Sequence, residues 1–216
     1  MVSDSPGNDQ GFVELWPTTF VRRRLDGFEE PTRALIELVR GLERRHRDLT
    51  TDYRAPDLFN RDDPAVDWLR TQVNHTVVGY FAHIGMDYPI DWTIQGWPSI
   101  NRFGDYHDAH NHPRAYLSGT YYAQVPTRRE PLKTRADLRP GCITFYDPRG
   151  SVNMTAIKGD PYVDPEYTVA PEPGLLLLWP AFINHFVHPN LSKQARISIS
   201  FNIMLKWTDD YLPDQG

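Results

Sequence analysis

The chain has a single cysteine, Cys142, among its 216 residues. One cysteine excludes an internal disulfide framework and a zinc site built on several thiolates. Cys142 lies in the apolar run Gly-Cys-Ile-Thr-Phe-Tyr. We therefore expect a buried structural thiol at this position rather than a nucleophile.

Long apolar runs and an excess of positive charge are also missing. No apolar stretch reaches the roughly 18 residues that a membrane span needs, and the N-terminus has no basic region followed by an apolar one. The net charge is −5, whereas proteins that bind nucleic-acid backbones usually carry a basic surface. We expect a cytoplasmic protein that spans no membrane and has no nucleic-acid partner.

Two amphipathic helices are predicted in the first half of the chain. Between residues 31 and 47, leucine and valine recur at i, i+3, i+4 and i+7, which is typical of one face of a helix. Asp63-Pro64 is typical of an N-cap followed by proline at the first helical position, and the apolar pattern behind it continues to about Ile84. Residues 1–10 are polar, so a flexible tail is expected.

Beyond residue 88 the pattern changes to short extended runs separated by glycine, proline and aspartate. The expected strands are 92–100, 116–125, 142–146, 167–169, 175–179, 185–188 and 196–205. Many short strands without alternating helices indicate a sandwich or barrel. We predict one domain over residues 11–216, with helical support at about 29–86 and a β core at about 90–207. The long connections 127–140 and 148–166 are candidates for the walls or lid of a substrate pocket.

Histidine is concentrated in two short windows. Five of the eight histidines lie there: His107, His110 and His112 near the middle of the chain, and His185 and His188 later. Neutral imidazole is the commonest protein metal ligand, and two ligands spaced two residues apart on a strand, joined by a third from elsewhere, form an open metal site. The first functional hypothesis is therefore a metal-dependent enzyme.

Strand alternation separates the candidates in the first window. If the segment around His110 is extended, positions 108, 110 and 112 share one face, and positions 107, 109 and 111 share the other. His110 and His112 can then bind one ion, with Asp108 either as a carboxylate ligand or as a hydrogen-bond partner of an imidazole. His107 is expected to face away, as a surface or hydrogen-bonding residue.

The same argument separates His185 from His188. They are an odd number of positions apart, so a strand would place them on opposite faces. His185 follows a long apolar run and so arrives from the core, whereas His188 precedes Pro189 and a polar turn. We expect His185 to be the ligand and His188 to be structural.

The last predicted strand alternates without a break from Arg196 to Ile203, with Arg, Ser, Ser and Asn on one face. A polar face on solvent explains this pattern equally well. However, an arginine begins the face, and guanidinium is the group best shaped to hold a carboxylate through two parallel hydrogen bonds. The eleven positions from His185 to Arg196 suffice for a turn and a return strand beside the first. We expect a carboxylate anchor close to the metal.

An ordered set of motifs extends over about residues 90–205. It comprises Trp97-Pro-Ser-Ile-Asn101, Gly104, His110-Asn-His112-Pro113, Ser118-Gly-Thr-Tyr-Tyr122, Asp147-Pro-Arg149, Pro180, His185 and Arg196-Ile-Ser-Ile-Ser-Phe-Asn202. This set resembles the non-haem Fe(II), 2-oxoglutarate-dependent oxygenases. The resemblance implies a mainly β fold, the double-stranded β-helix or jelly roll, with the two N-terminal helices packed on one sheet. It also implies an oxidoreductase that uses Fe(II) and 2-oxoglutarate, oxidises a substrate and releases succinate.

The resemblance assigns roles to both groups of residues. His110, His112 and His185 stand at the positions of the metal ligands. Residue 112 is histidine where a carboxylate ligand usually stands, and three neutral ligands leave more positive charge on the metal. Asp108 is the fallback ligand.

The co-substrate end has matching positions as well. Arg196 and Ser198 stand where the wider superfamily binds the distal carboxylate of 2-oxoglutarate, and Tyr122 matches a tyrosine that binds the same carboxylate in prolyl-hydroxylase-like members. Asn101 and Arg149 are candidate contacts of the substrate or co-substrate.

Two other functions remain compatible with the sequence. A cupin-like three-histidine iron dioxygenase without 2-oxoglutarate explains His112 better, but leaves the Arg196-x-Ser198 strand without a task. The second alternative is a non-enzymatic protein that keeps the β-helix and binds a structural metal. The sequence names no substrate beyond a small molecule or a peptide, and it leaves homo-oligomerisation open.

Overall fold

The computed structural model describes residues 17–45, 57–86, 89–127, 135, 137–149 and 164–206. The elements in these ranges are β1 (Val21–Arg24), α1 (Glu29–Glu43), the short 3₁₀ helix η1 (Leu58–Asn60), α2 (Pro64–His83), β2 (Trp92–Asn101), β3 (His107–His110), β4 (Leu117–Gln124), β5 (Ile143–Tyr146), β6 (Glu166–Val169), β7 (Leu175–Pro180), β8 (His185–Val187) and β9 (Arg196–Leu205). No helix in the described ranges is long and apolar enough to cross a membrane.

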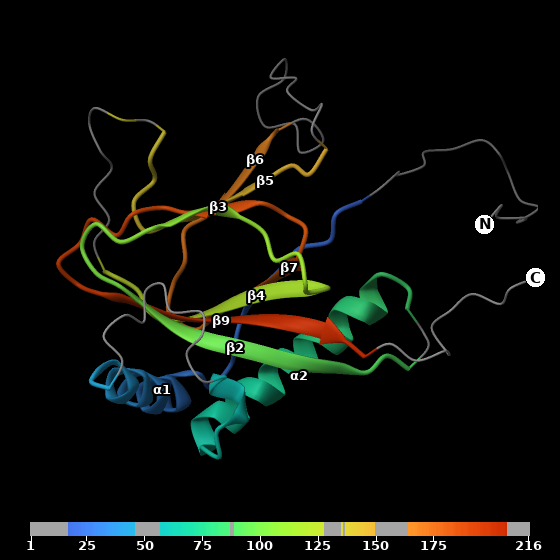
Figure 1. The fold of residues 1–216 in the computed structure, drawn as a ribbon, viewed down its shortest axis with the longest axis horizontal. Helices are drawn as coiled ribbons and strands as arrows, with labels where there is room; N and C mark the ends of the chain where they lie inside the picture. Colours follow the sequence, from blue (N-terminus) through green and yellow to red (C-terminus); the bar gives the residue numbers. More distant parts are fainter. Residues whose placement is uncertain are drawn as a thin grey trace, which may run out of the picture.

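The strands form two antiparallel sheets that face each other. The larger sheet has the strand order β1-β7-β4-β9-β2, and the smaller has the order β3-β8-β5-β6. In Figure 1 the smaller sheet lies above the larger one, and both helices lie beneath the larger one. The fold is therefore the predicted double-stranded β-helix with two helices on one sheet.

The helices α1 and α2 cover the outer face of the larger sheet. α2 begins where the sequence predicts, because the Asp63 side chain accepts hydrogen bonds from Ala65 N (2.8 Å) and Val66 N (3.3 Å) just before the helix. One apolar cluster joins buried helix residues to Ile197, Ile199, Phe201 and Ile203 of β9. Each such side chain contributes about 1.5–3 kcal/mol on burial. Since this core holds the apolar face of β9, the polar face points between the sheets.

The register of the larger sheet aligns these polar side chains with others. Arg196 of β9 pairs with Asn101 of β2, and Ser198 pairs with Ser99 of β2 and with Tyr122 of β4. Residues that pair across adjacent antiparallel strands point to the same side of the sheet. The polar face of β9 is therefore one row of a wider polar surface inside the β-helix rather than a solvent-facing strand.

Most predicted elements are confirmed. Each of the seven predicted strands is present with boundaries within one residue of those expected, and β1 and β3 are present besides these seven. α1 ends at Glu43, earlier than predicted. Cys142 is only partly buried, because it lies in the turn that precedes β5, where its N–H donates to Arg139 O at 3.0 Å. The tail 1–10 and most of the predicted lid connections lie outside the described residues.

The prediction that the chain returns beside β8 is wrong. Both edges of β8 are paired, with β3 on one side and β5 on the other. The connection instead crosses to the larger sheet, where β9 lies between β4 and β2. Asn190 holds this crossing, because its side-chain amide donates to Asn101 O at 2.9 Å and to Gln194 O at 2.8 Å. His185 and Arg196 therefore approach the interior from opposite sheets.

Candidate metal centre and its pocket

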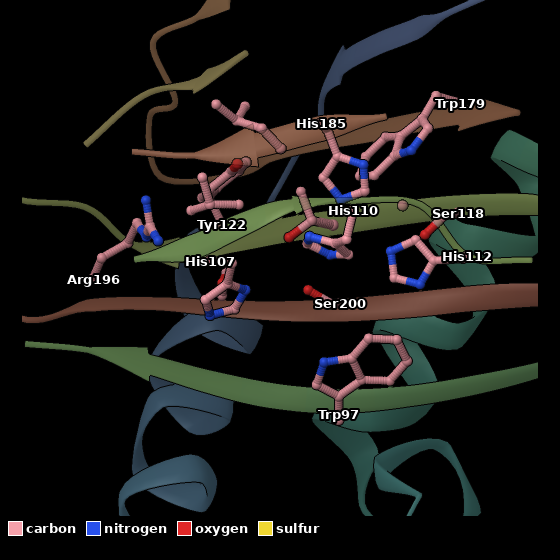
Figure 2. A pocket seen from close by; sticks show the side chains of 15 residues that line it. Trp97, His107, His110, His112, Ser118, Tyr122, Trp179, His185, Arg196 and Ser200 are labelled. Atoms are coloured by element: carbon pink, nitrogen blue, oxygen red, sulfur yellow. The ribbon is translucent and has the colours of Figure 1, made fainter. Parts of the chain in front are cut away.

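A pocket lies between the two sheets and is lined from both. The smaller sheet contributes His107, His110, His185, Ile143 and Val187, and the larger sheet contributes Trp97, Ser118, Gly119, Thr120, Tyr122, Trp179, Arg196, Ser198 and Ser200; His112 follows β3. Figure 2 shows the three histidines at positions 110, 112 and 185 turned toward one another. In the same view Arg196 and Tyr122 lie together at the other end of the pocket.

His110, His112 and His185 form a cluster of possible metal ligands. One ring nitrogen from each lies within 4.8 Å of those of the other two. The ring centroids are 4.3 Å apart for His110 and His185, 5.2 Å for His110 and His112, and 5.3 Å for His112 and His185. The structure thus brings together the three histidines that the sequence selected. Their assignment as metal ligands stays a prediction.

Backbone carbonyls orient two of the three rings. The Nδ1–H of His110 donates to Asp108 O at 2.6 Å, and the Nδ1–H of His185 donates to Ile183 O at 3.2 Å. Because a carbonyl oxygen only accepts hydrogen bonds, these contacts place the proton of a neutral ring on Nδ1. The Nε2 lone pair of each ring then remains available to a metal, which is a common arrangement for ligating histidines.

Burial keeps the imidazoles of His112 and His185 neutral. Burial, with a smaller contribution from the neighbouring His110, lowers the pKa of His185 from 6.5 to about 3 and that of His112 from 6.5 to about 4. A neutral imidazole is the form that binds a metal. The pocket therefore holds both side chains in the ligand state at neutral pH.

The pKa of His185 predicts acid sensitivity of the metal-free protein. The unfolded chain takes up a proton near the ordinary pKa of 6.5, whereas folded His185 resists protonation down to about pH 3. The stabilisation is fully present above pH 6.5 and is lost progressively as pH falls below it. We expect His185 to account for a loss of about 2 kcal/mol in the free energy of unfolding between pH 7 and pH 5. Urea unfolding of His185→Gln should show a pH dependence smaller by that amount, and an identical dependence would contradict the buried neutral ring.

His107 corrects one prediction, because it faces the pocket and does not point away. The register between β3 and β8 places His107 opposite Val187 and His110 opposite His185. An advance of three residues along β3 therefore matches an advance of only two residues along β8. A bulge of this kind adds one residue and reverses the alternation of side chains. His107 and His110 consequently line the same pocket.

Asn101 connects His107 to Arg196. The Arg196 guanidinium donates from Nη2 to Asn101 Oδ1 at 2.9 Å, and Asn101 Nδ2 lies 3.3 Å from His107 Nε2. Since guanidinium only donates, the amide orientation is fixed, and Nδ2 must donate to His107 Nε2. Asn101 is fully buried and does not line the pocket. The network therefore holds Arg196 and His107 in place, and Asn101 reaches a ligand only through them.

Arg196, Ser198 and Tyr122 lie together as the sequence analysis expected. All three line the pocket, and their exposed fractions are 1%, 6% and 3%. Tyr122 pairs with Ser198 across the adjacent strands β4 and β9. A guanidinium, a hydroxyl and a phenol at one end of a pocket form a set of donors suited to a carboxylate. Their role in binding a co-substrate stays a prediction.

The other predicted site residues lie outside the pocket. Asp108 is exposed, and its carboxylate accepts a hydrogen bond from Ala109 N at 2.8 Å, so the structure does not add it to the histidine cluster. The Arg149 side chain is exposed and forms an ion pair with Asp147 at 2.6 Å. His188 is buried and hydrogen-bonds Thr144 Oγ1 at 2.8 Å, in keeping with a structural role.

Sequence reasoning missed the two tryptophans as pocket residues in their own right. Trp97 lies 6.0 Å from His112 between ring centroids, and Trp179 lies 5.0 Å from His185. Trp179 Nε1 is buried and has no hydrogen-bond partner among the described residues. Both tryptophans face the pocket because Trp97 pairs with Ser200 and Trp179 pairs with Ser118, and these serines lie on the polar surface of the larger sheet. Sequence alone does not give that pairing.

Comparisons with known proteins identify a sequence family and solved structures that are similar to this chain. Residues 95–202 match a sequence family described as "Putative 2OG-Fe(II) oxygenase". A search of curated protein sequences found no match. Among solved structures, a prolyl-4-hydroxylase from Pseudomonas putida is similar with a TM-score of 0.60 and 13% identity, over 87% of this chain and 88% of that one.

Two further solved structures show the same fold. A prolyl hydroxylase from Trichoplax adhaerens, in complex with a peptide fragment of a hypoxia inducible factor, has a TM-score of 0.56 and 14% identity, with 86% of this chain and 83% of that one covered. HygX from Streptomyces hygroscopicus, with nickel and 2-oxoglutarate bound, has a TM-score of 0.55 and 13% identity, with 87% and 82% covered. At these identities the likeness shows the fold alone.

Proposed function

The chain belongs to the 2OG-Fe(II) oxygenase family, and on this premise we propose that it is an Fe(II)- and 2-oxoglutarate-dependent dioxygenase whose iron is held by His110, His112 and His185. The clustering of these three side chains is the observation that carries the proposal. When bound, Fe(II) and 2-oxoglutarate would support oxidation by O2, in which one oxygen atom goes to the substrate and the other converts 2-oxoglutarate to succinate and CO2.

The histidine cluster fits an iron ion. Imidazole nitrogen suits Fe(II), and the Nε2 atoms of His110 and His185 are directed by the hydrogen bonds of Nδ1 to backbone carbonyls. The described residues add no carboxylate to the cluster, which itself offers three imidazole ligands. The site is therefore more electropositive than one with two histidines and a carboxylate, and this favours an anionic co-substrate.

The other end of the pocket supports a carboxylate-binding role. Arg196 carries its positive charge at a position that is 1% exposed, and it lines the pocket beside Ser198 and Tyr122. The planar donors of a guanidinium match the geometry of a carboxylate, and charge-assisted hydrogen bonds are roughly twice as strong as neutral ones. We infer that Arg196, Ser198 and Tyr122 bind the distal carboxylate of 2-oxoglutarate. This task for Arg196 favours an oxygenase that uses 2-oxoglutarate over a cupin-like enzyme that does not.

Several other side chains are expected to position the reactants and exclude water. Trp97 and Trp179 flank His112 and His185, and the hydroxyls of Thr120 and Ser200 lie on the sheet face between the two ends of the pocket. Aromatic rings beside the ligands restrict their rotation and lower the local dielectric constant. Such preorganisation of bound groups accounts for much of the rate gain in enzymes.

Turnover without a substrate tests the proposal. An enzyme of the proposed kind can convert 2-oxoglutarate to succinate slowly even when the prime substrate is absent. The test is therefore succinate formation from 2-oxoglutarate in air. We expect succinate only when both Fe(II) and 2-oxoglutarate are added to the purified full chain, and at least tenfold less with His110→Ala. Succinate formed at equal rates without added iron, in the presence of a chelator, would contradict the proposal.

Asn101→Asp is expected to weaken 2-oxoglutarate binding about tenfold. An aspartate at this position would place a negative charge against Arg196 and compete with the co-substrate carboxylate, which corresponds to about 1.4 kcal/mol. Fe(II) affinity should stay within about twofold, because the histidine cluster is not changed. Anaerobic titration of both ligands checks this.

A matched control is available on α2. Asn74→Asp adds the same charge where Asn74 Oδ1 accepts a hydrogen bond from Trp92 Nε1 at 2.9 Å, and aspartate preserves that bond. It should bind 2-oxoglutarate as the unaltered protein does. Equal affinities in Asn101→Asp and Asn74→Asp would show that Asn101 does not position Arg196.

A further inference from the structure

A second hollow adjoins the histidine cluster on the side of α2. Its volume is about 780 Å³, within the range of small-molecule sites. Residues 17–19, the C-terminal turn of α2, the connection from β3 to β4 and the turn after β7 form its walls. His112 lines both this hollow and the inner pocket, so we call it the His112 groove.

Hydrogen bonds hold the walls of the groove beside the metal ligands. His112 N donates to Ala181 O at 2.9 Å, and Ala181 N donates to Tyr116 O at 3.0 Å. The Tyr116 ring also stacks on Phe81 of α2, with ring centroids 5.7 Å apart. The β3 to β4 connection is thereby tied to both the turn after β7 and the helix.

The lining of the groove is mostly apolar, and its polar side chains are hydroxyls, one amide and the imidazoles of His83 and His112. Ile84, Tyr116 and Phe182 line it and are 36%, 41% and 58% exposed. Among the described lining residues there is no Asp, Glu, Lys or Arg, although these make up 24% of the chain. Burial raises the pKa of Tyr80 to about 12, so this lining phenol is neutral at physiological pH. A cationic ligand would lose its hydration here without gaining a counter-charge, and the described lining offers an anionic ligand no lysine or arginine.

We propose that the His112 groove binds the body of the prime substrate, and that this body is an uncharged, apolar small molecule or ring system. The inference rests on the proposed function, since it is His112 that brings the groove beside the iron ligands. Exposed aromatic side chains at the rim gain most from covering by an apolar ligand. A cavity of about 780 Å³ accommodates a compact organic molecule rather than a folded partner.

The test uses 6-fluoroindole, an uncharged aromatic probe, and the full-length protein loaded with Co(II) or Zn(II). Fluorine NMR titration gives its dissociation constant, and paramagnetic relaxation by Co(II) reports proximity to the metal. We expect saturable binding to both forms and strong relaxation enhancement only with Co(II). Absence of enhancement in protein whose cobalt absorption shows a bound ion would overturn the inference.

Variants locate the probe. Phe182→Asp and Ile84→Asp each place a carboxylate in the groove and should weaken binding at least tenfold. Phe103→Asp is the matched control, because Phe103 is 67% exposed and does not line the groove, and it should bind within twofold of the unaltered protein. Equal weakening in all three variants would overturn the inference, as would a dimer in solution that Phe182→Asp dissociates. Failure of the protein to bind Co(II) at all would instead contradict the proposed function, which separates the two claims.

Discussion

His185→Ala is expected to abolish Fe(II) binding in the range where the unaltered protein is saturated, with affinity falling at least about 100-fold. His185 contributes one of three clustered ring nitrogens, and its ring is 3% exposed and oriented by the carbonyl of Ile183. Removing one of three protein ligands should lower metal affinity more than removing a residue that only orients a ligand, which already lowers it about 10–100-fold. Anaerobic competition with a chromophoric chelator measures the affinity.

His188→Ala is the matched control for this experiment. It removes a histidine of similar burial, 2% exposed, that hydrogen-bonds Thr144 instead of joining the cluster. We expect it to retain Fe(II) affinity within about twofold, provided that circular dichroism shows the same fold. Equal iron affinity in His185→Ala and the unaltered protein would remove His185 from the metal site.

Arg196→Met is expected to weaken 2-oxoglutarate binding about 100-fold and to leave Fe(II) affinity unchanged. Methionine keeps much of the apolar volume but removes the charge and the hydrogen-bond donors. Loss of one partner of a desolvated charge pair costs roughly 2–5 kcal/mol, and a 100-fold loss corresponds to about 2.7 kcal/mol. Anaerobic titration of the iron-loaded protein with 2-oxoglutarate checks the result.

Arg196→Lys separates the effect of charge from that of geometry. Lysine keeps one positive charge but offers no planar pair of donors, so we expect an intermediate loss of affinity. Thermal unfolding shows whether either variant is folded. If Arg196→Met binds 2-oxoglutarate as tightly as the unaltered protein, then the guanidinium is not the carboxylate anchor.

Local patterns in the sequence predicted the elements and most of the candidate site. Asp63-Pro64 fixed the start of α2 because an N-cap acts within one helical turn. The alternation from Arg196 to Ile203 identified the two faces of β9 because the apolar face is buried by the helices. His110, His112 and His185 were selected by strand periodicity, and the fold brings them together.

The errors arose where the outcome depended on pairing between distant strands. His107 turned into the pocket because a bulge against β8 reversed the alternation that an ideal strand would show. The path from His185 to Arg196 crossed between sheets because both edges of β8 were already paired. Asn101 was predicted to contact a ligand, yet its register opposite Arg196 made it a buried partner of the guanidinium. None of these pairings is encoded in a local pattern.

The most direct test of the proposed iron and 2-oxoglutarate site is the visible absorption of the iron-loaded protein when 2-oxoglutarate is added without oxygen. We predict a charge-transfer band that saturates at one equivalent of each. At the same co-substrate concentration, the band should be absent in His185→Ala and strongly reduced in Arg196→Met. No band at saturating iron and 2-oxoglutarate would contradict the proposed site.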